Sequence, residues 1–293
     1  MQVAYLGPAG SFSESAATAL FCRDNCKYIL CDSLDDLESI LKQKQTDFTV
    51  TPFFNSKEGV LKSKIYNKTY LENLLAQFEL DNNLKIIGEK FVPLNFYLLA
   101  KPGSSLNQIT HVNVNPYGKN LCAKFLATYP NWKIIENPSS SAAAKAIFDA
   151  PENEIHSALA SKDAATQYQL EILQKNIIPE EDLPIMHFLV ISTGSSDTPS
   201  FCPQDMDKEL IYVYAVQNTH CISELKSQKI PLLNLHEING KLYLEISGPL
   251  KEKQQHFLDS LQAKKLGIYK PCEKRKQYQE KMLSPIFKRY LPH

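Results

Sequence analysis

Short hydrophobic runs alternate with helical patterns along the first two-thirds of the chain. Residues 3–6 form a compact apolar run typical of a buried strand, and residues 13–21 repeat their apolar positions at helical spacing. The alternation continues, with strands predicted at 27–31, 48–52, 86–91, 94–100, 109–114, 133–135, 157–160 and 188–192, and helices at 34–41, 117–127, 139–148 and 162–168. Strands that alternate with helices in this way predict an α/β fold with largely parallel sheets.

The pattern changes at two places, which divide the chain into domains. A break near 100–103 separates two similar halves, so we expect a catalytic module (1–193) of two lobes around a central cleft, as in periplasmic binding proteins. The lobes are predicted at about 1–100 plus 185–193, and at 101–184. Residues 194–208 have the composition of a linker.

Residues 209–293 are expected to form a second domain. Their predicted βαββαβ order is typical of ferredoxin-like domains. The end of the chain, from residue 270, carries seven Lys or Arg and two Glu, which we interpret as a solvated basic tail.

Composition excludes several classes of function. The 293 residues include 32 Lys and Arg and 32 Asp and Glu, and a net charge of zero argues against nucleic-acid binding. No apolar stretch reaches the roughly 18 residues of a membrane span, and the start of the chain does not resemble a signal peptide. Seven cysteines, an odd number, favour free thiols in a reducing cytoplasm, and we expect neither a metal nor a cofactor.

Three serine-bearing stretches could bind an anion. They are Gly-Pro-Ala-Gly-Ser-Phe-Ser at 7–13, the segment 52–59 with Asn55 and Ser56, and Ser-Ser-Ser-Ala-Ala-Ala at 139–144. The first and third open predicted helices, where free backbone N–H groups and hydroxyls bind anions, and the second leaves a strand end. Each is also typical of an ordinary turn or helix cap. Together they indicate a ligand with more than one carboxylate. His187 has a side chain suited to proton transfer, or to a structural role.

In this order, the three stretches resemble the motifs of the prephenate dehydratase family. That family opens with a GPxGTFS-type motif and continues with VPxENSxxG-type and STxAA-type segments, matched here at 7–13, 52–59 and 139–144. Asn115-Pro116 partly matches its SHP turn, and 158–170 matches a further AIAS-type segment. The C-terminal βαββαβ unit resembles the regulatory ACT domain of the same enzymes. The resemblance implies a homodimer or tetramer.

The chain departs from the family pattern where the chemistry is expected. The family's Thr-Arg-Phe motif, with Asn two places before Thr, aligns with Pro184 and with Met186-His187-Phe188. Phe54 stands where the family has Glu, and Asn115 where it has His. Methionine cannot donate a proton to a leaving hydroxyl, and histidine cannot form the two-point carboxylate contact of arginine.

These departures favour a non-aromatising prephenate decarboxylase, a branch of the family that releases CO₂ and keeps the ring hydroxyl. Two alternatives remain open: a prephenate dehydratase with His187 as substitute acid, and a non-catalytic sensor of small acids. The resemblance implies a site whose catalytic residues are His187, Met186 and Asn55. Its substrate-binding residues would be Ser11, Phe12, Phe54, Ser56, Ser140, Ser141 and Phe188. The altered effector motifs, with His220 and Cys221 in the first, predict weak or no feedback by phenylalanine.

Overall fold

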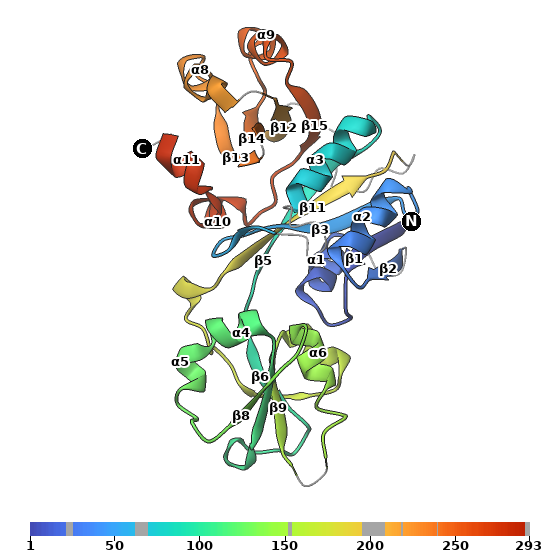
Figure 1. Cartoon of the computed structure of the whole chain (residues 1–293), viewed down its shortest axis with the longest axis vertical. Helices are drawn as coiled ribbons and strands as arrows, with labels where there is room; N and C mark the ends of the chain where they lie inside the picture. Colours follow the sequence, from blue (N-terminus) through green and yellow to red (C-terminus); the bar gives the residue numbers. More distant parts are fainter. Residues whose placement is uncertain are drawn as a thin grey trace.

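The structure, a computed structural model, describes residues 1–21, 26–61, 70–151, 154–194, 209–217, 219–238 and 240–290. Three units follow one another along the longest axis of the molecule (Figure 1). The first lobe lies in the middle, the second lobe below it and the C-terminal unit above it. The chain is therefore a two-lobed α/β module with a further α/β unit attached to the first lobe. Among the described residues, no helix combines the length and apolarity needed to cross a bilayer.

The first lobe is built on strands in the order β5-β11-β3-β1-β2, with β4 paired to β3. The strands are β1 (Gln2–Leu6), β2 (Lys27–Cys31), β3 (Phe48–Asn55), β4 (Gly59–Val60), β5 (Lys85–Pro93) and β11 (Ile185–Ser192). The helices are α1 (Phe12–Leu20), α2 (Leu34–Lys42) and α3 (Tyr70–Leu80). Ser33 caps α2 through its hydroxyl, and Asp35 and Asp36 lie in the first turn, where the helix dipole favours acids.

The second lobe is a five-stranded sheet in the order β10-β6-β9-β7-β8. Its strands are β6 (Tyr97–Ala100), β7 (His111–Val114), β8 (Lys133–Glu136), β9 (His156–Ala160) and β10 (Glu171–Gln174). Its helices are α4 (Pro116–Leu121), α5 (Ala123–Leu126), α6 (Ser140–Lys145) and α7 (Lys162–Gln167). Because β6 pairs with β9 and β10, the second lobe begins before residue 101, the expected boundary.

The C-terminal unit has the βαββαβ order that the sequence predicts. Its elements are β12 (Leu210–Val216), α8 (Ile222–Ser227), β13 (Leu232–Ile238), β14 (Lys241–Gly248), α9 (Glu252–Ser260) and β15 (Lys264–Tyr269). The strand order β13-β14-β12-β15 is that of a ferredoxin-like sheet. Of the predicted linker, residues 195–208 lie outside the described residues.

The expected solvated tail is instead folded and packed. It forms α10 (Arg275–Met282) and α11 (Pro285–Tyr290), and α10 buries Arg275, Tyr278 and Met282. Helix α10 packs against β11 of the first lobe, and α11 against β13. The basic composition concealed this, because the buried side chains are spaced among exposed lysines.

One strand pair joins the C-terminal unit to the first lobe. Strand β15 runs parallel to β5, with Gly267 opposite Ile86, so that a single ten-stranded sheet passes through both units. A Cβ atom on Gly267 would lie 2.0 Å from the Ile86 carbonyl oxygen. Only glycine fits this approach, and the junction therefore depends on it.

Candidate active site

Strand β11 separates two side chains that the sequence places together. Met186 packs against the cores of the first and second lobes, with Phe188 buried in the first-lobe core on the same side. His187 is 3% exposed and points to the other side of the sheet, where its Nε2 lies 3.0 Å from the Glu89 carboxylate. Because side chains alternate along a strand, His187 does not reach the surface between the lobes. The expectation that His187 donates a proton to substrate is therefore wrong for this structure.

Asn55 connects the two lobes next to Met186. It lies opposite Met186 in the β3–β11 pairing and is 1% exposed. Its Nδ2 donates to the phenol oxygen of Tyr117 at 2.9 Å, while its Oδ1 accepts from the Lys57 backbone N–H at 2.8 Å. The amide is thus held by its own turn and presented to the second lobe.

Tyr117 brings a hydroxyl from the second lobe to Asn55. It lies in the first turn of α4, which Asn115 caps by accepting from the Gly118 N–H. Burial raises the pKa of Tyr117 to about 12. The phenol therefore stays protonated at neutral pH and can act as a donor.

The first serine stretch meets the second lobe, but its serine has a local role. The Ser11 hydroxyl accepts from the Glu14 N–H and caps α1, and the Glu14 carboxylate accepts from the Gly10 N–H at 2.6 Å. The protein's own carboxylate thus takes the place expected for a ligand anion. Phe12 crosses to the second lobe and packs edge-to-face on Phe96, with ring centroids 5.7 Å apart.

The third serine stretch fixes the first one in place. Ser139 caps α6, and the buried Ser141 hydroxyl donates to the Ala9 carbonyl of the first lobe. Ser161 donates to the Gly10 carbonyl at 2.7 Å. Ser140 is also buried, at 9% exposure. The first and third stretches therefore meet across the lobes, with Ser141 bound to backbone of the other lobe.

Two further residues of the second motif support the strands. The Ser56 hydroxyl accepts from the Ile185 N–H at 2.9 Å and pins the start of β11. Phe54 is 4% exposed and packs on His236 of the C-terminal unit, with ring centroids 5.1 Å apart. Phe54 and the core residue Phe188 do not line the surface between the lobes, contrary to expectation.

A groove of about 420 Å³ opens between the lobes beside the first and third stretches. Its lining is Leu6, Gly7, Pro8, Asp32, Ser33, Leu34, Asp35, Pro138, Ser139 and Ala142. Because Asp32 and Asp35 contribute negative charge, this groove disfavours a doubly charged anion. Neither Asn55 nor Tyr117 lines this groove.

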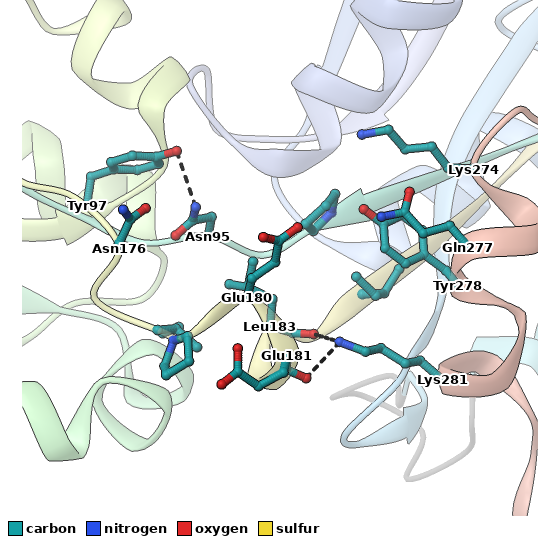
Figure 2. Close-up of a pocket in the computed structure, with 14 residues that line it drawn as sticks. Asn95, Tyr97, Asn176, Glu180, Glu181, Leu183, Lys274, Gln277, Tyr278 and Lys281 are labelled. Atoms are coloured by element: carbon teal, nitrogen blue, oxygen red, sulfur yellow. Dashed lines mark hydrogen bonds between the residues drawn. The ribbon is translucent and has the colours of Figure 1, made fainter.

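A second cavity, of about 800 Å³, lies between α10 and the strands that connect the lobes (Figure 2). Glu180 and Glu181 face it from one side and Lys274 and Lys281 from the other. Lys281 donates to the Glu181 carbonyl at 2.8 Å. None of the site residues predicted from the sequence lines this cavity.

Tyr117 is not among the site residues that the sequence predicts. It directly follows the Asn115-Pro116 turn, and an aromatic residue in the first turn of a helix is usually a core residue. Its partner Asn55 lies 62 positions earlier in the chain. Only the approach of the two lobes shows that the phenol meets the amide.

Comparison with known proteins gives a consistent picture. The family model described as prephenate dehydratase matches residues 3–196. The bifunctional chorismate mutase/prephenate dehydratase of Enterobacter agglomerans is 27% identical over 286 residues, which covers 92% of this chain and 70% of that protein. The chain spans about half the length of several other curated relatives it matches.

Solved structures share the fold at low sequence identity. Prephenate dehydratase from Arthrobacter aurescens, solved in complex with L-Phe, superposes with a TM-score of 0.71 at 18% identity, covering 92% of this chain and 90% of that chain. GqqA, described as a quorum-quenching acylase, gives a TM-score of 0.70 at 18% identity, covering 94% of this chain and 100% of that chain. The fold is thus common to proteins described by different activities.

Proposed function

Since the chain belongs to the prephenate dehydratase family, we propose that it is a lyase that converts prephenate to phenylpyruvate in aromatic amino acid biosynthesis. The observation that carries the proposal is the Asn55–Tyr117 pair beside Met186. It supplies a hydroxyl donor next to Asn55, the residue that pairs with the position of the replaced threonine. The proposal also implies a cytoplasmic enzyme, as expected of this metabolism.

The reaction needs an acid because hydroxide is a poor leaving group. As the C–C bond to the ring carboxylate breaks, CO₂ leaves and its electron pair enters the ring. The ring C–O bond breaks, and the phenol proton of Tyr117 passes to the departing oxygen to form water. Solvent then returns a proton to the Tyr117 phenolate. A positioned acid of this kind contributes about 10²–10⁴ in rate.

Each neighbour of Tyr117 has a distinct part in this proposal. The Asn55 amide holds the phenol in one orientation, because it donates to the Tyr117 oxygen at 2.9 Å and accepts from the hydroxyl at 3.2 Å. Met186 gives the site an apolar wall that donates no proton. Ser56 fixes the start of β11, on which Met186 lies.

Met186 also favours a second candidate function. A methionine in the place of the family's threonine suits a non-aromatising prephenate decarboxylase, which must withhold protons from the ring hydroxyl. In that case Tyr117 would hold the hydroxyl without protonating it. The product would be a dihydro-4-hydroxyphenylpyruvate.

Incubation of the purified chain with prephenate separates the candidates. Ultraviolet spectra and product mass are followed together, with a boiled-protein control for spontaneous breakdown. Phenylpyruvate at a rate above the control supports the dehydratase. A product that has lost CO₂ and kept oxygen supports the decarboxylase, and unchanged prephenate that binds in calorimetry supports the sensor.

For the C-terminal unit, we propose an ACT-type domain that persists as a homodimer or tetramer interface. The ferredoxin-like strand order supports this assignment. The altered effector motif, which contains Cys221, has no glycine whose backbone an amino-acid effector could approach. The Cys221 side chain is buried, at 1% exposure. We expect no phenylalanine binding, and calorimetry that gave a micromolar dissociation constant would contradict this.

A further inference from the structure

Three metal-ligating side chains meet at one end of the second lobe. His111 begins β7, His156 begins β9, and the two residues are opposite each other in the parallel pairing of these strands. Glu154 lies two positions before His156. Its Oε2 is 2.9 Å from the His156 Nε2 and 3.6 Å from the His111 Nδ1. One ligand atom from each residue lies within 4.8 Å of the other two.

We propose that His111, Glu154 and His156 bind one Zn²⁺ ion. Two imidazoles and one carboxylate are a known protein donor set for zinc, with the fourth position left to water. The imidazole rings are stacked, nearly parallel at 10° with centroids 4.5 Å apart, so one ring must turn for both to direct a nitrogen at the same ion.

The surroundings suit a partly open site. The side chains of His111 and His156 are 10% and 8% exposed, whereas that of Glu154 is 36% exposed and leaves a path for the ion. The Asn113 amide lies 3.3 Å from the His156 Nδ1 and holds its ring. Lys133, opposite His111 on β8, contributes a competing positive charge.

Two bonds near the site must rearrange when zinc binds. The Thr110 hydroxyl lies 2.8 Å from the His111 Nδ1, the nitrogen nearest Glu154, and has the Ile155 carbonyl as its other partner at 3.3 Å. His156 must free its Nε2 lone pair, which now faces Glu154. The first change needs rotation of the Thr110 hydroxyl. The second moves the ring proton of His156 to Nδ1, so the Asn113 amide, whose Nδ2 now faces that nitrogen, must turn as well.

The metal site is separate from the candidate active site. Strands β7 and β9 run from these histidines to the opposite edge of the sheet, where α4 and α7 begin. Zinc would tie β7, β9 and the segment before β9 together, and it would stabilise the second lobe without taking part in turnover.

Zinc titration of the chelator-treated, tag-free full chain tests the proposal. Calorimetry should give one Zn²⁺ per chain with a dissociation constant in the micromolar range or below, and no binding of Mg²⁺. Thermal unfolding should shift upward with zinc. Glu154→Gln, on a partly exposed side chain, should keep the fold and weaken binding at least tenfold, and His156→Gln should abolish it.

His256→Ala, at an exposed histidine on α9, is the matched control and should bind like the parent protein. The proposal is overturned if the parent chain binds no zinc, or if Glu154→Gln and His156→Gln bind it with parent affinity. Circular dichroism of each variant shows whether loss of binding reflects loss of fold. Should His156→Gln unfold, the Glu154→Gln affinity alone decides.

Discussion

Replacement of Arg275 by methionine removes the guanidinium that lies between two buried carboxylates. Arg275 Nη1 is 2.5 Å from the Glu89 carboxylate of the first lobe, and Nη2 bonds to Glu245 of the C-terminal unit. The side chains of Arg275, Glu89 and Glu245 are 7%, 0% and 2% exposed. This cluster therefore joins the two units through charges that are removed from water.

The expected cost follows from what the substitution leaves behind. Breaking a buried ion pair by removal of one partner costs about 3–5 kcal/mol, because a carboxylate stays buried without its counter-charge. That is a large part of a typical unfolding free energy of about 5–15 kcal/mol. We expect Arg275→Met to lower the free energy of unfolding by about 3–5 kcal/mol at pH 7, measured by urea titration with circular dichroism.

The same cluster predicts how this loss depends on pH. Burial by itself would raise the pKa of Glu245, but the charge and hydrogen bond of Arg275, together with the charges of His187 and His236, hold the pKa below its usual value. A carboxylate whose pKa is lower in the folded than in the unfolded chain stabilises the fold at pH values above its unfolded pKa. This stabilisation is lost as the pH falls through its folded pKa. Without Arg275, Glu245 protonates more readily, so the difference between variant and parent should shrink towards about pH 4.

Lys276→Met is the matched control. Lys276 is next to Arg275, but its side chain is 85% exposed and its ammonium is 3.6 Å from Glu209. An exposed pair of this kind is worth about 0–1 kcal/mol. Addition of Glu89→Gln and Glu245→Gln to Arg275→Met should recover part of the lost stability. If the free energy of unfolding of Arg275→Met lies within about 1 kcal/mol of that of the parent, the buried cluster does not hold the two units together.

Three further changes test other parts of the structure. Gly267→Ala places a Cβ 2.0 Å from the Ile86 carbonyl oxygen, and we expect a loss of about 1–3 kcal/mol in thermal unfolding; an unchanged melting temperature would mean that β15 and β5 do not pair. Burial lowers the pKa of His236 to about 4, below the value of about 6.5 in the unfolded chain. The contribution of neutral His236 to the free energy of unfolding should therefore be fully present above about pH 6.5. It should fall by up to roughly 3 kcal/mol as pH approaches 4, and His236→Gln should flatten this pH dependence. Met186→Thr restores a hydroxyl beside Asn55 and should raise the rate of phenylpyruvate formation; a rate at or below that of the parent would show that β11 does not face the substrate there.

Most of the fold could be predicted from the sequence because its strands and helices have clear periods and caps. Strand β2 (Lys27–Cys31) is found at the predicted residues, and helix α2 (Leu34–Lys42) begins at the predicted one. Helix α10 was missed because Arg275 is buried only through Glu89, 186 positions away, and Glu245, 30 positions away. No local pattern reveals partners at such distances.

The candidate site was predicted less well than the fold. The alternation of a strand implies that Met186 and His187 face opposite sides, so only one of them can face the surface between the lobes. Ser11 and Ser139 cap helices, which was the alternative stated for both stretches. The pairs Asn55–Tyr117 and His111–His156 depend on how lobes and strands are brought together, which residue spacing does not show.

Turnover of prephenate by Tyr117→Phe tests the central claim most directly. This variant loses one oxygen atom and keeps the ring that packs in the second lobe. Tyr129→Phe, in the same lobe, is the matched control and should match the parent. We expect Tyr117→Phe to lower kcat for phenylpyruvate at least about 100-fold, with little change in KM or melting temperature. A kcat equal to that of the parent, with phenylpyruvate still the product, would contradict the account.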